Sequence, residues 1–463
     1  MVVKEGAVSL EDGLAKYLAN ITFDSLPEEV VSYCKLLVID SLGVTFAGVR
    51  APGCREMINV VSQWQVPNGS SILIYGIGVP APLAALANGT MMHALDFDDT
   101  LDTSALHTFV SVFPSALAAA EVRGKVSGKD FITSLVAGVE ITCRLGLACT
   151  RPLSWIRTTT CGTFGAAAAA GKILGLNYEE LKNALGIAYS QSSGNAQCLV
   201  EGRLVKRLQP GFASQAGVIS AFLARSGITG PERYLVGKFG FFPLYEHNQF
   251  NEDSIVENLG TRHSILSLSI KSYPCCRMTH ASIDAALSIR EFVKDRLDTI
   301  EKIEVLVPKM PAEMVGKPFE IGPNPQVDAQ FSIPYTVSVA LIRGDVFLQD
   351  FEVPNIIDEK VLSLAKKVKV VEAPDFPAKE MSYAALTVKM VDGREFRKEV
   401  RAPIGSVENP LTKEQCYEKF RKCLEYSKLD LDAVVIDELI EAVEELEKLD
   451  DVGRISRLAR AKV

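Results

Sequence analysis

The hydrophobic pattern of this chain changes near residue 265, and this change constrains the fold more than any other feature. From residue 8 to about 265, apolar residues recur with helical spacing in one segment after another. The segment 300–308, IEKIEVLVP, then alternates as a β-strand does, and 384–400, AALTVKMVDGREFRKEV, predicts two strands around a hairpin turn at Asp392–Gly393. Helical spacing returns after Gly405, in LTKEQCYEKFRKCLEY and in DAVVIDELIEAVEELEKL.

These patterns predict a mainly α protein with two parts. We expect a large all-helical domain, residues 1–265 plus 405–463, and a smaller α+β lid domain, residues 266–404, inserted before the C-terminal helices. A cleft between two such domains is where a small-molecule site is expected.

Local signals place individual helix ends and contacts. Ser25 is expected to cap a helix that has Pro27 in its first turn, and Asn177, with Glu180 three residues later, is expected to cap another after a stop at Gly175. The run of glycine and alanine from 162 to 171 is too small for an ordinary core, so it predicts close approach between helices inside the bundle.

Composition excludes several classes of protein. The 463 residues carry a net charge of −8 and no long run of Lys or Arg, which argues against nucleic acid or an anionic membrane as a partner. The first residues have charges where a secretion signal needs its apolar stretch, so we expect a cytoplasmic location. The ten cysteines include no C-x-x-C pair, and five histidines leave little material for a metal centre, so no metal or cofactor is predicted.

The stretch 93–107, HALDFDDTLDTSALH, carries the candidate chemistry, and three interpretations compete. Asp98, Asp99 and Asp102 form a D-D-x-x-D string of the kind that binds magnesium, but the chain has no second such motif. A solvated helix end is the plainest alternative. It does not explain why His93, Asp96 and Thr100 have the spacing that would place them on one helical face, which favours an acid/base site.

The same stretch resembles the signature of the MmgE/PrpD family, which includes 2-methylcitrate dehydratases, cis-aconitate decarboxylase and an iminodisuccinate epimerase. The resemblance rests on HALDFDDT followed by His107, and it extends over nearly the whole chain through these segments: GTFGAAAAAGKILGL (162–176), VKRLQPGFASQAG (205–217) with ITGPE soon after, KSYPCCRMTHASIDA (271–285) and GSVENPLT (405–412). It implies a helical domain with an α+β lid, a homodimer, and no metal or iron–sulfur cluster.

The resemblance also implies functional positions at Asp96, Thr100, His107, Lys206 and Lys271. Three positions depart from the decarboxylase branch of the family. Ile156 and Cys276 stand where that branch has histidines, and Met314 stands where it has a tyrosine. These departures favour a different substrate from cis-aconitate.

The reactions of that family share a carbanion next to a carboxylate, which needs a proton-transfer group and fixed positive charge. His107 is the candidate base or acid, with Asp96 expected to orient its ring. Lys206 and Lys271 are also assigned as catalytic residues. The candidate substrate-binding residues are Thr100, Arg207, Arg277, His280 and Cys276. Among them, Arg207 and Arg277 are expected to form a carboxylate clamp together with the two lysines.

Plainer interpretations of these residues stay open. Lys206 and Arg207 could be a surface pair, His280 could cap a helix instead of binding substrate, and Cys276 could be a packing residue. We therefore expect a cofactor-independent lyase of the 2-methylcitrate dehydratase type, acting on a small di- or tricarboxylate. The alternatives are an isomerase or epimerase with the same carbanion chemistry, and a carboxylate-binding protein without catalysis.

Overall fold

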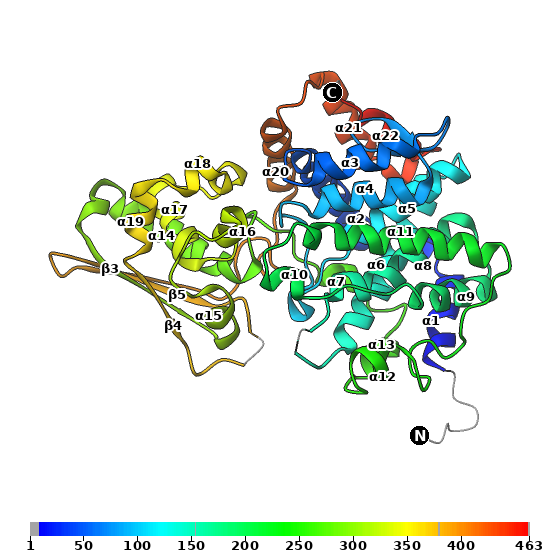
Figure 1. Cartoon of the computed structure of the whole chain (residues 1–463), viewed down its shortest axis with the longest axis horizontal. Helices are drawn as coiled ribbons and strands as arrows, with labels where there is room; N and C mark the ends of the chain where they lie inside the picture. Colours follow the sequence, from blue (N-terminus) through cyan, green and yellow to red (C-terminus); the bar gives the residue numbers. More distant parts are fainter. Residues whose placement is uncertain (1–8, 153, 378–379, 462–463) are drawn as a thin grey trace.

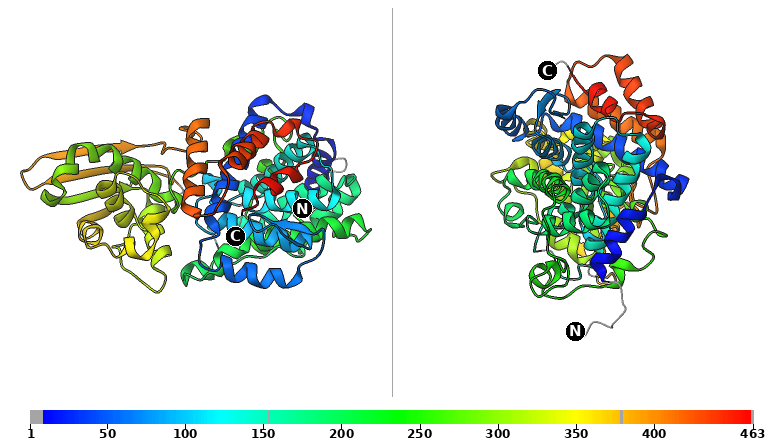
Figure 2. Two further views of the ribbon diagram at one scale, coloured as in Figure 1. Left: turned by 90° about the horizontal axis from the view of Figure 1, so that it is seen from above. Right: turned by 90° about the vertical axis from the view of Figure 1, so that its right-hand side faces the viewer.

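The computed structural model describes residues 9–152, 154–377 and 380–461, which form two lobes with separate hydrophobic cores. One core joins apolar residues from Leu14 to Ile270 with those from Cys416 to Ala461, and it also takes in Phe347 and Leu348. The other core joins residues between Tyr273 and Met390. Figure 1 shows the helical lobe and the smaller mixed lobe side by side, and Figure 2 shows the same division from above. The mainly α class is therefore confirmed, whereas the domain limits stay a prediction.

The helical lobe is a bundle whose long helices pack around α8. Its helices are α1 (Leu10–Asn20), α2 (Glu28–Gly48), α3 (Cys54–Val61), α4 (Ala81–His93), α5 (Phe109–Arg123), α6 (Gly128–Ala148), α7 (Arg157–Thr160), α8 (Gly162–Leu174), α9 (Tyr178–Tyr189), α10 (Gln197–Val200), α11 (Val205–Arg225), α12 (Phe241–Tyr245) and α13 (Asp253–Val256). After the small lobe the chain adds α20 (Lys413–Ser427), α21 (Ala433–Glu444) and α22 (Gly453–Leu458). A short hairpin, β1 (Ser70–Ile72) with β2 (Ile77–Val79), lies between α3 and α4.

The small-residue run forms the centre of this bundle, as predicted. Helix α8 packs against α5, α6 and α11. A Cβ atom on Gly165 would lie 2.5 Å from the carbonyl oxygen of Gly138, and one on Gly217 would lie 2.4 Å from the Cβ of Ala166. The backbones of these helices approach too closely for larger side chains.

Two helices of the bundle, α2 and α6, have the length and apolar composition of membrane spans. Inside the protein, 72% of the apolar window of α2 and 94% of that of α6 are buried. Helices buried to this extent are typical of a protein core.

The small lobe contains a four-stranded sheet with the order β4-β3-β5-β6. Strand β3 (Ile300–Val307) pairs in parallel with β4 (Val368–Glu372) and antiparallel with β5 (Ala384–Met390), which in turn pairs antiparallel with β6 (Glu395–Val400). The helices of this lobe are α14 (His280–Val293), α15 (Lys309–Val315), α16 (Pro325–Gln330), α17 (Ile333–Arg343), α18 (Val353–Ile356) and α19 (Glu359–Ala365). The hairpin expected at Asp392–Gly393 is confirmed, with Gly393 at a φ of 84°.

The expected helix boundaries are partly confirmed. Asn177 and Glu180 form a reciprocal capping box at the start of α9, and Gly175 ends α8 in the left-handed region. The cap expected at Ser25 is wrong, because α2 starts at Glu28 after Pro27. The Ser25 hydroxyl instead closes a short turn with the backbone of Thr22.

Candidate active site

The acidic stretch is a loop between α4 and α5. Helix α4 ends at His93, Asp96 has a φ of 56°, and Thr100 exchanges backbone hydrogen bonds with Ser269 as a β-bridge. The expectation that His93, Asp96 and Thr100 share one helical face is therefore wrong. The left-handed conformation at Asp96 stops the helix, and the loop that follows turns its side chains in several directions.

The His107 ring is held through its Nδ1 atom. This atom lies 2.6 Å from the carbonyl oxygen of Asp99 and 2.9 Å from the Oδ2 atom of Asp98. A carbonyl oxygen can only accept a hydrogen bond, so Nδ1 carries the proton and Nε2 keeps its lone pair in the neutral ring. His107 lines a cavity, so the arrangement provides a base there.

Asp98, and not Asp96, is the carboxylate that contacts His107, so the expected role of Asp96 in orienting the ring is wrong. The same Oδ2 atom of Asp98 also lies 2.9 Å from Nδ1 of His93, whose ring meets that of His107 edge to face at 4.8 Å between centroids. Burial lowers the pKa of His93 to about 4, despite the nearby Asp98. His93 is therefore neutral near pH 7. Its hydrogen bond holds the Asp98 carboxylate in contact with His107.

Asp96 instead pairs with two lysines from distant parts of the chain. Its Oδ1 atom lies 3.1 Å from Nζ of Lys206, in the first turn of α11, and 3.4 Å from Nζ of Lys271. The Lys271 ammonium also donates to the backbone carbonyl of Asp96 at 2.8 Å. Burial alone would raise the pKa of the Asp96 carboxyl, but the two ammonium groups hold this pKa well below its usual range. Within this group of three residues, two positive charges face one negative charge, so the ammonium groups can still attract a substrate carboxylate or a carbanion.

Arg277 is buried and held from two sides. Its Nε atom donates to Asp102 at 3.0 Å, and its Nη1 atom donates to Nδ1 of His280 at 3.1 Å. Its Nη2 atom is buried and has no hydrogen-bond partner among the described residues. Because a buried donor without a partner is costly, a carboxylate that accepts from Nη2 would be well bound.

His280 lies behind this arginine and outside the lining of the cavity, fully buried at the start of α14. The expected direct contact between His280 and substrate is therefore wrong. Burial and the Arg277 charge hold the pKa of His280 well below its usual range, so the neutral ring accepts from Arg277. Its Nε2 atom faces the backbone carbonyl of Cys275 at 3.4 Å.

These groups meet in one cavity between the lobes, which encloses about 760 Å³ of empty space, part of it open to solvent. The predicted residues that line it are Asp96, Thr100, His107, Lys206, Lys271, Cys276 and Arg277. Ile156 and Met314, the other positions that depart from the decarboxylase branch, line it as well. Burial raises the pKa of the Cys276 thiol to about 11, so this cysteine is a neutral wall residue.

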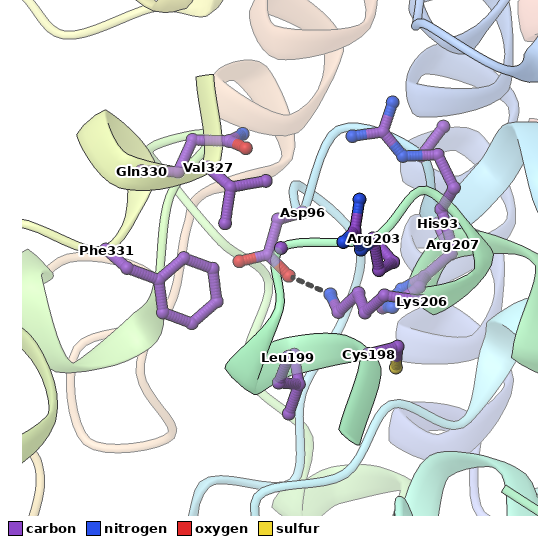
Figure 3. A pocket seen from close by; sticks show the side chains of 12 residues that line it. His93, Asp96, Cys198, Leu199, Arg203, Lys206, Arg207, Val327, Gln330 and Phe331 are labelled. Carbon is purple, nitrogen blue, oxygen red and sulfur yellow. Dashed lines mark hydrogen bonds and ion pairs between the residues drawn. The ribbon is translucent and has the colours of Figure 1, made fainter. Parts of the chain in front are cut away.

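A second, smaller cavity adjoins the first, and the two share His93, Asp96 and Lys206 (Figure 3). Arg207 lines this second cavity and not the first, and its Nη1 atom donates to the carbonyl of Pro52 at 2.6 Å. The structure thus separates Arg207 from the other members of the predicted clamp.

Two residues at the centre of the site, His93 and Asp98, were not predicted as catalytic or substrate-binding residues. The sequence pointed to Asp98 only as part of the D-D-x-x-D string and to His93 only through its spacing from Asp96 and Thr100.

The D-D-x-x-D string does not converge on one point. Asp98 contacts the two histidines, Asp99 accepts from the backbone nitrogens of Thr108 and Phe109 and so caps α5, and Asp102 pairs with Arg277. Within the described residues, one group has the donor types of a metal site, namely His93, Asp98 and His107, with ligand atoms within 4.8 Å of one another. Their contacts of 2.9 Å are hydrogen-bond distances, and both imidazoles turn Nδ1 toward one oxygen. This group fits a hydrogen-bonded triad.

Comparison with known families agrees with this arrangement over most of the chain. The model of the MmgE/PrpD N-terminal domain matches residues 12–253, and that of the MmgE/PrpD C-terminal domain matches residues 273–445. The chain belongs to the MmgE/PrpD family. All the cavity residues that the resemblance supplied, from Asp96 to Lys271, lie within these matches or in the segment that joins them.

Individual relatives in this family are named as decarboxylases. A cis-aconitate decarboxylase-like protein of Aspergillus oryzae is 27% identical over 440 residues, which cover 90% of each chain. The cis-aconitate decarboxylase of Aspergillus terreus is 26% identical over 431 residues and 88% of each chain. The human cis-aconitate decarboxylase is 29% identical over 434 residues, 89% of this chain and 87% of its own. The Aspergillus terreus and human relatives are by their names lyases that act on a carboxylate, and the Aspergillus oryzae relative is named as similar to such an enzyme.

Proposed function

We propose that this protein is a cofactor-independent lyase that acts on a small di- or tricarboxylate. The observation that carries the proposal is the combination found in one cavity. The free Nε2 atom of His107 is available as a base, and Lys206, Lys271 and Arg277 supply positive charge around it. This combination suits removal of a proton from a carbon next to a carboxylate.

The proposed reaction is the dehydration of a 2-hydroxy tricarboxylate such as 2-methylcitrate or citrate. The Nε2 atom of His107 takes the proton from the carbon next to one carboxylate, and the electron pair of that C–H bond becomes the carbanion. The two lysines stabilise the charge that grows on the carboxylate. The pair then forms a carbon–carbon double bond as the C–O bond of the hydroxyl breaks, and the imidazolium returns its proton to the departing hydroxide, which leaves as water.

Asp98 supports both halves of this cycle. Its carboxylate holds the Nδ1–H tautomer of His107 while the ring acts as a base, and it stabilises the imidazolium that forms. Thr100 and Arg277 are assigned to the carboxylates and hydroxyl that do not react.

A decarboxylase is the second candidate, because the similar proteins named above are cis-aconitate decarboxylases. Decarboxylation would use the same positive groups to stabilise a carbanion, which a proton on His107 would then quench. Ile156, Cys276 and Met314 favour the dehydratase, since all three departures from the decarboxylase branch lie in the cavity wall. An epimerase would use the same carbanion and return the proton to its other face.

One panel of substrates separates these candidates. Dehydration of 2-methylcitrate or citrate creates a conjugated carboxylate, whose ultraviolet absorbance rises directly, whereas decarboxylation of cis-aconitate releases carbon dioxide. Exchange of deuterium from the solvent into a dicarboxylate, without loss of a group, would indicate the epimerase. Binding of these acids with none of the three reactions would contradict the proposal and favour a carboxylate-binding protein.

We also propose a homodimer, which the family resemblance implies, and a cytoplasmic location. Light scattering at micromolar concentration should give about twice the mass of the chain. A monomer under those conditions would count against this assembly.

A further inference from the structure

We propose that the substrate carries an extended apolar arm in addition to its carboxylates. This inference rests on the proposed function, and it concerns the wall of the same cavity. Besides the charged and polar groups, the cavity is lined by six apolar side chains larger than alanine: Ile156, Leu199, Met278, Met314, Phe331 and Met381. A site for a compact tricarboxylate alone has no use for so much apolar surface.

The apolar wall is built from both lobes. Ile156 precedes α7 and Leu199 belongs to α10, both in the helical lobe, whereas Met314 lies in α15 and Phe331 directly follows α16 in the small lobe. In Figure 3, Phe331 and Lys206 lie on opposite sides of Asp96. A ligand whose carboxylate faces the lysines would therefore turn its other end toward Phe331.

This wall continues out of the cavity. A neighbouring groove shares Leu199, Met314 and Phe331 with it, and encloses about 950 Å³ of empty space, much of it open. Farther out the groove is lined by Val200, which is 80% exposed, by Phe319, and by the charged residues Lys317, Glu320 and Asp328. An alkyl chain that starts next to the carboxylates thus meets apolar side chains first, at Leu199, Met314 and Phe331, before it reaches the charged outer part of the groove.

The exposure of the shared residues indicates that something apolar covers them in use. Met314 is 54% exposed although it lines the cavity, and Leu199 and Phe331 are only partly buried. Methionine is flexible and adapts to ligands of different shape. Covering these side chains with an alkyl arm would remove apolar surface from water, which favours binding in proportion to the area covered.

The test uses saturated 2-alkylsuccinates, from unsubstituted succinate to 2-hexylsuccinate, with the full-length protein. These acids have no hydroxyl to expel, so their binding is independent of dehydration. The dissociation constant, measured by isothermal titration calorimetry, should fall about fourfold for each methylene group added over the first members of the series. No binding by any member, or affinity that is flat or weaker with length, would overturn the inference.

A variant and a matched control locate the arm. Met314→Ser removes part of the shared wall at a half-exposed position and should flatten the gain per methylene group. Val391→Ser changes another exposed apolar residue of the small lobe, 71% exposed and outside the cavity lining, and should leave the gain intact. Equal effects of the two variants would contradict the assignment.

The two proposals fail in different ways. A gain with chain length but no turnover of 2-hydroxy acids would keep the apolar arm and overturn the dehydratase. Turnover of citrate or 2-methylcitrate with no gain along the alkyl series would keep the dehydratase and overturn the apolar arm.

Discussion

The two lobes contribute unlike surfaces to the one cavity. The helical lobe supplies the groups that can react, with His107 and Asp96 from one loop and Lys206 from the first turn of α11. The small lobe supplies Met314, Phe331 and Met381, none of which can transfer a proton or carry a charge. It also supplies the charged Lys271 and Arg277. The comparison teaches that the candidate base comes from the helical lobe, whereas the small lobe contributes positive charge and most of the large apolar side chains of the wall.

The loop that carries His107 and Asp96 is held by contacts from both lobes. Lys419 of α20 donates to the carbonyl of Phe97 at 2.8 Å and pairs with Asp40 at 2.6 Å, so the C-terminal helices hold the reactive loop from behind. The small lobe also contacts this loop. The Gln330 amide donates to the carbonyl of Leu95 at 2.9 Å, and Lys271 and Arg277 also donate to the loop. A rigid loop suits groups that must meet the reacting atoms at fixed distances.

The largest effect is expected from His107→Gln, which removes the base from the helical side. The glutamine keeps similar size and polarity but cannot take the proton, so kcat should fall by about 10²–10⁴-fold while KM changes little. Steady-state kinetics with the turned-over acid checks this result. The control is His247→Gln, an exposed histidine, which should be neutral. A full kcat in His107→Gln would mean that the helical side does not hold the base.

The next effect is expected from Lys206→Ala, which reduces the positive charge on the helical side. Asp96 would then neutralise Lys271, so both the bound carboxylate and the carbanion lose stabilisation. A charged hydrogen bond contributes about 1.5–3 kcal/mol, so kcat/KM should fall roughly 10- to 100-fold, with kcat and KM both affected. Arg225→Ala, an exposed position at the other end of α11, is the matched control. A change confined to KM would leave Lys206 with binding alone.

The sequence predicted which residues gather more accurately than how they contact one another. The family motifs pointed to Asp96, His107, Lys206 and Lys271, and the charge of Arg277 in one of these motifs pointed to a carboxylate clamp. Asp98 pairs with His107 in a loop in which Asp96 has a left-handed backbone conformation, and no local sequence pattern predicts this conformation.

The remaining contacts of the site depend on long-range packing, which the local sequence does not predict. The position of His280 behind Arg277 follows from the start of α14, which turns the ring into the core. Lys271 reaches Asp96 across 175 positions of sequence, and spacing alone cannot show such a contact.

A smaller effect is expected from His280→Leu, which tests a residue that supports the site without lining it. The leucine removes the acceptor for Arg277, so the guanidinium loses one of its two supports, and KM should rise about tenfold with kcat less affected. His280→Asn places an amide oxygen close to the position of Nδ1 and should restore most of the affinity. If the asparagine variant were as impaired as the leucine variant, packing and not the hydrogen bond would explain the loss.

No effect is expected from removal of metal. The carboxylates of Asp98, Asp99 and Asp102 have separate protein partners, so exhaustive dialysis against a chelator should leave kcat/KM unchanged. Metal analysis of the purified protein accompanies the assay. Loss of activity that magnesium restores would contradict the acid/base interpretation of the helical side.

The separation of chemistry from selection is tested most directly by one ratio, kcat/KM for a long-chain 2-alkyl hydroxy acid divided by that for the unsubstituted acid. It is measured in the wild type, in His107→Gln and in Met314→Ser. We predict that His107→Gln lowers both values and leaves the ratio unchanged, whereas Met314→Ser lowers the ratio. A ratio that changes in His107→Gln, or that stays at the wild-type value in Met314→Ser, would contradict the separate roles of the His107 base and the Met314 wall.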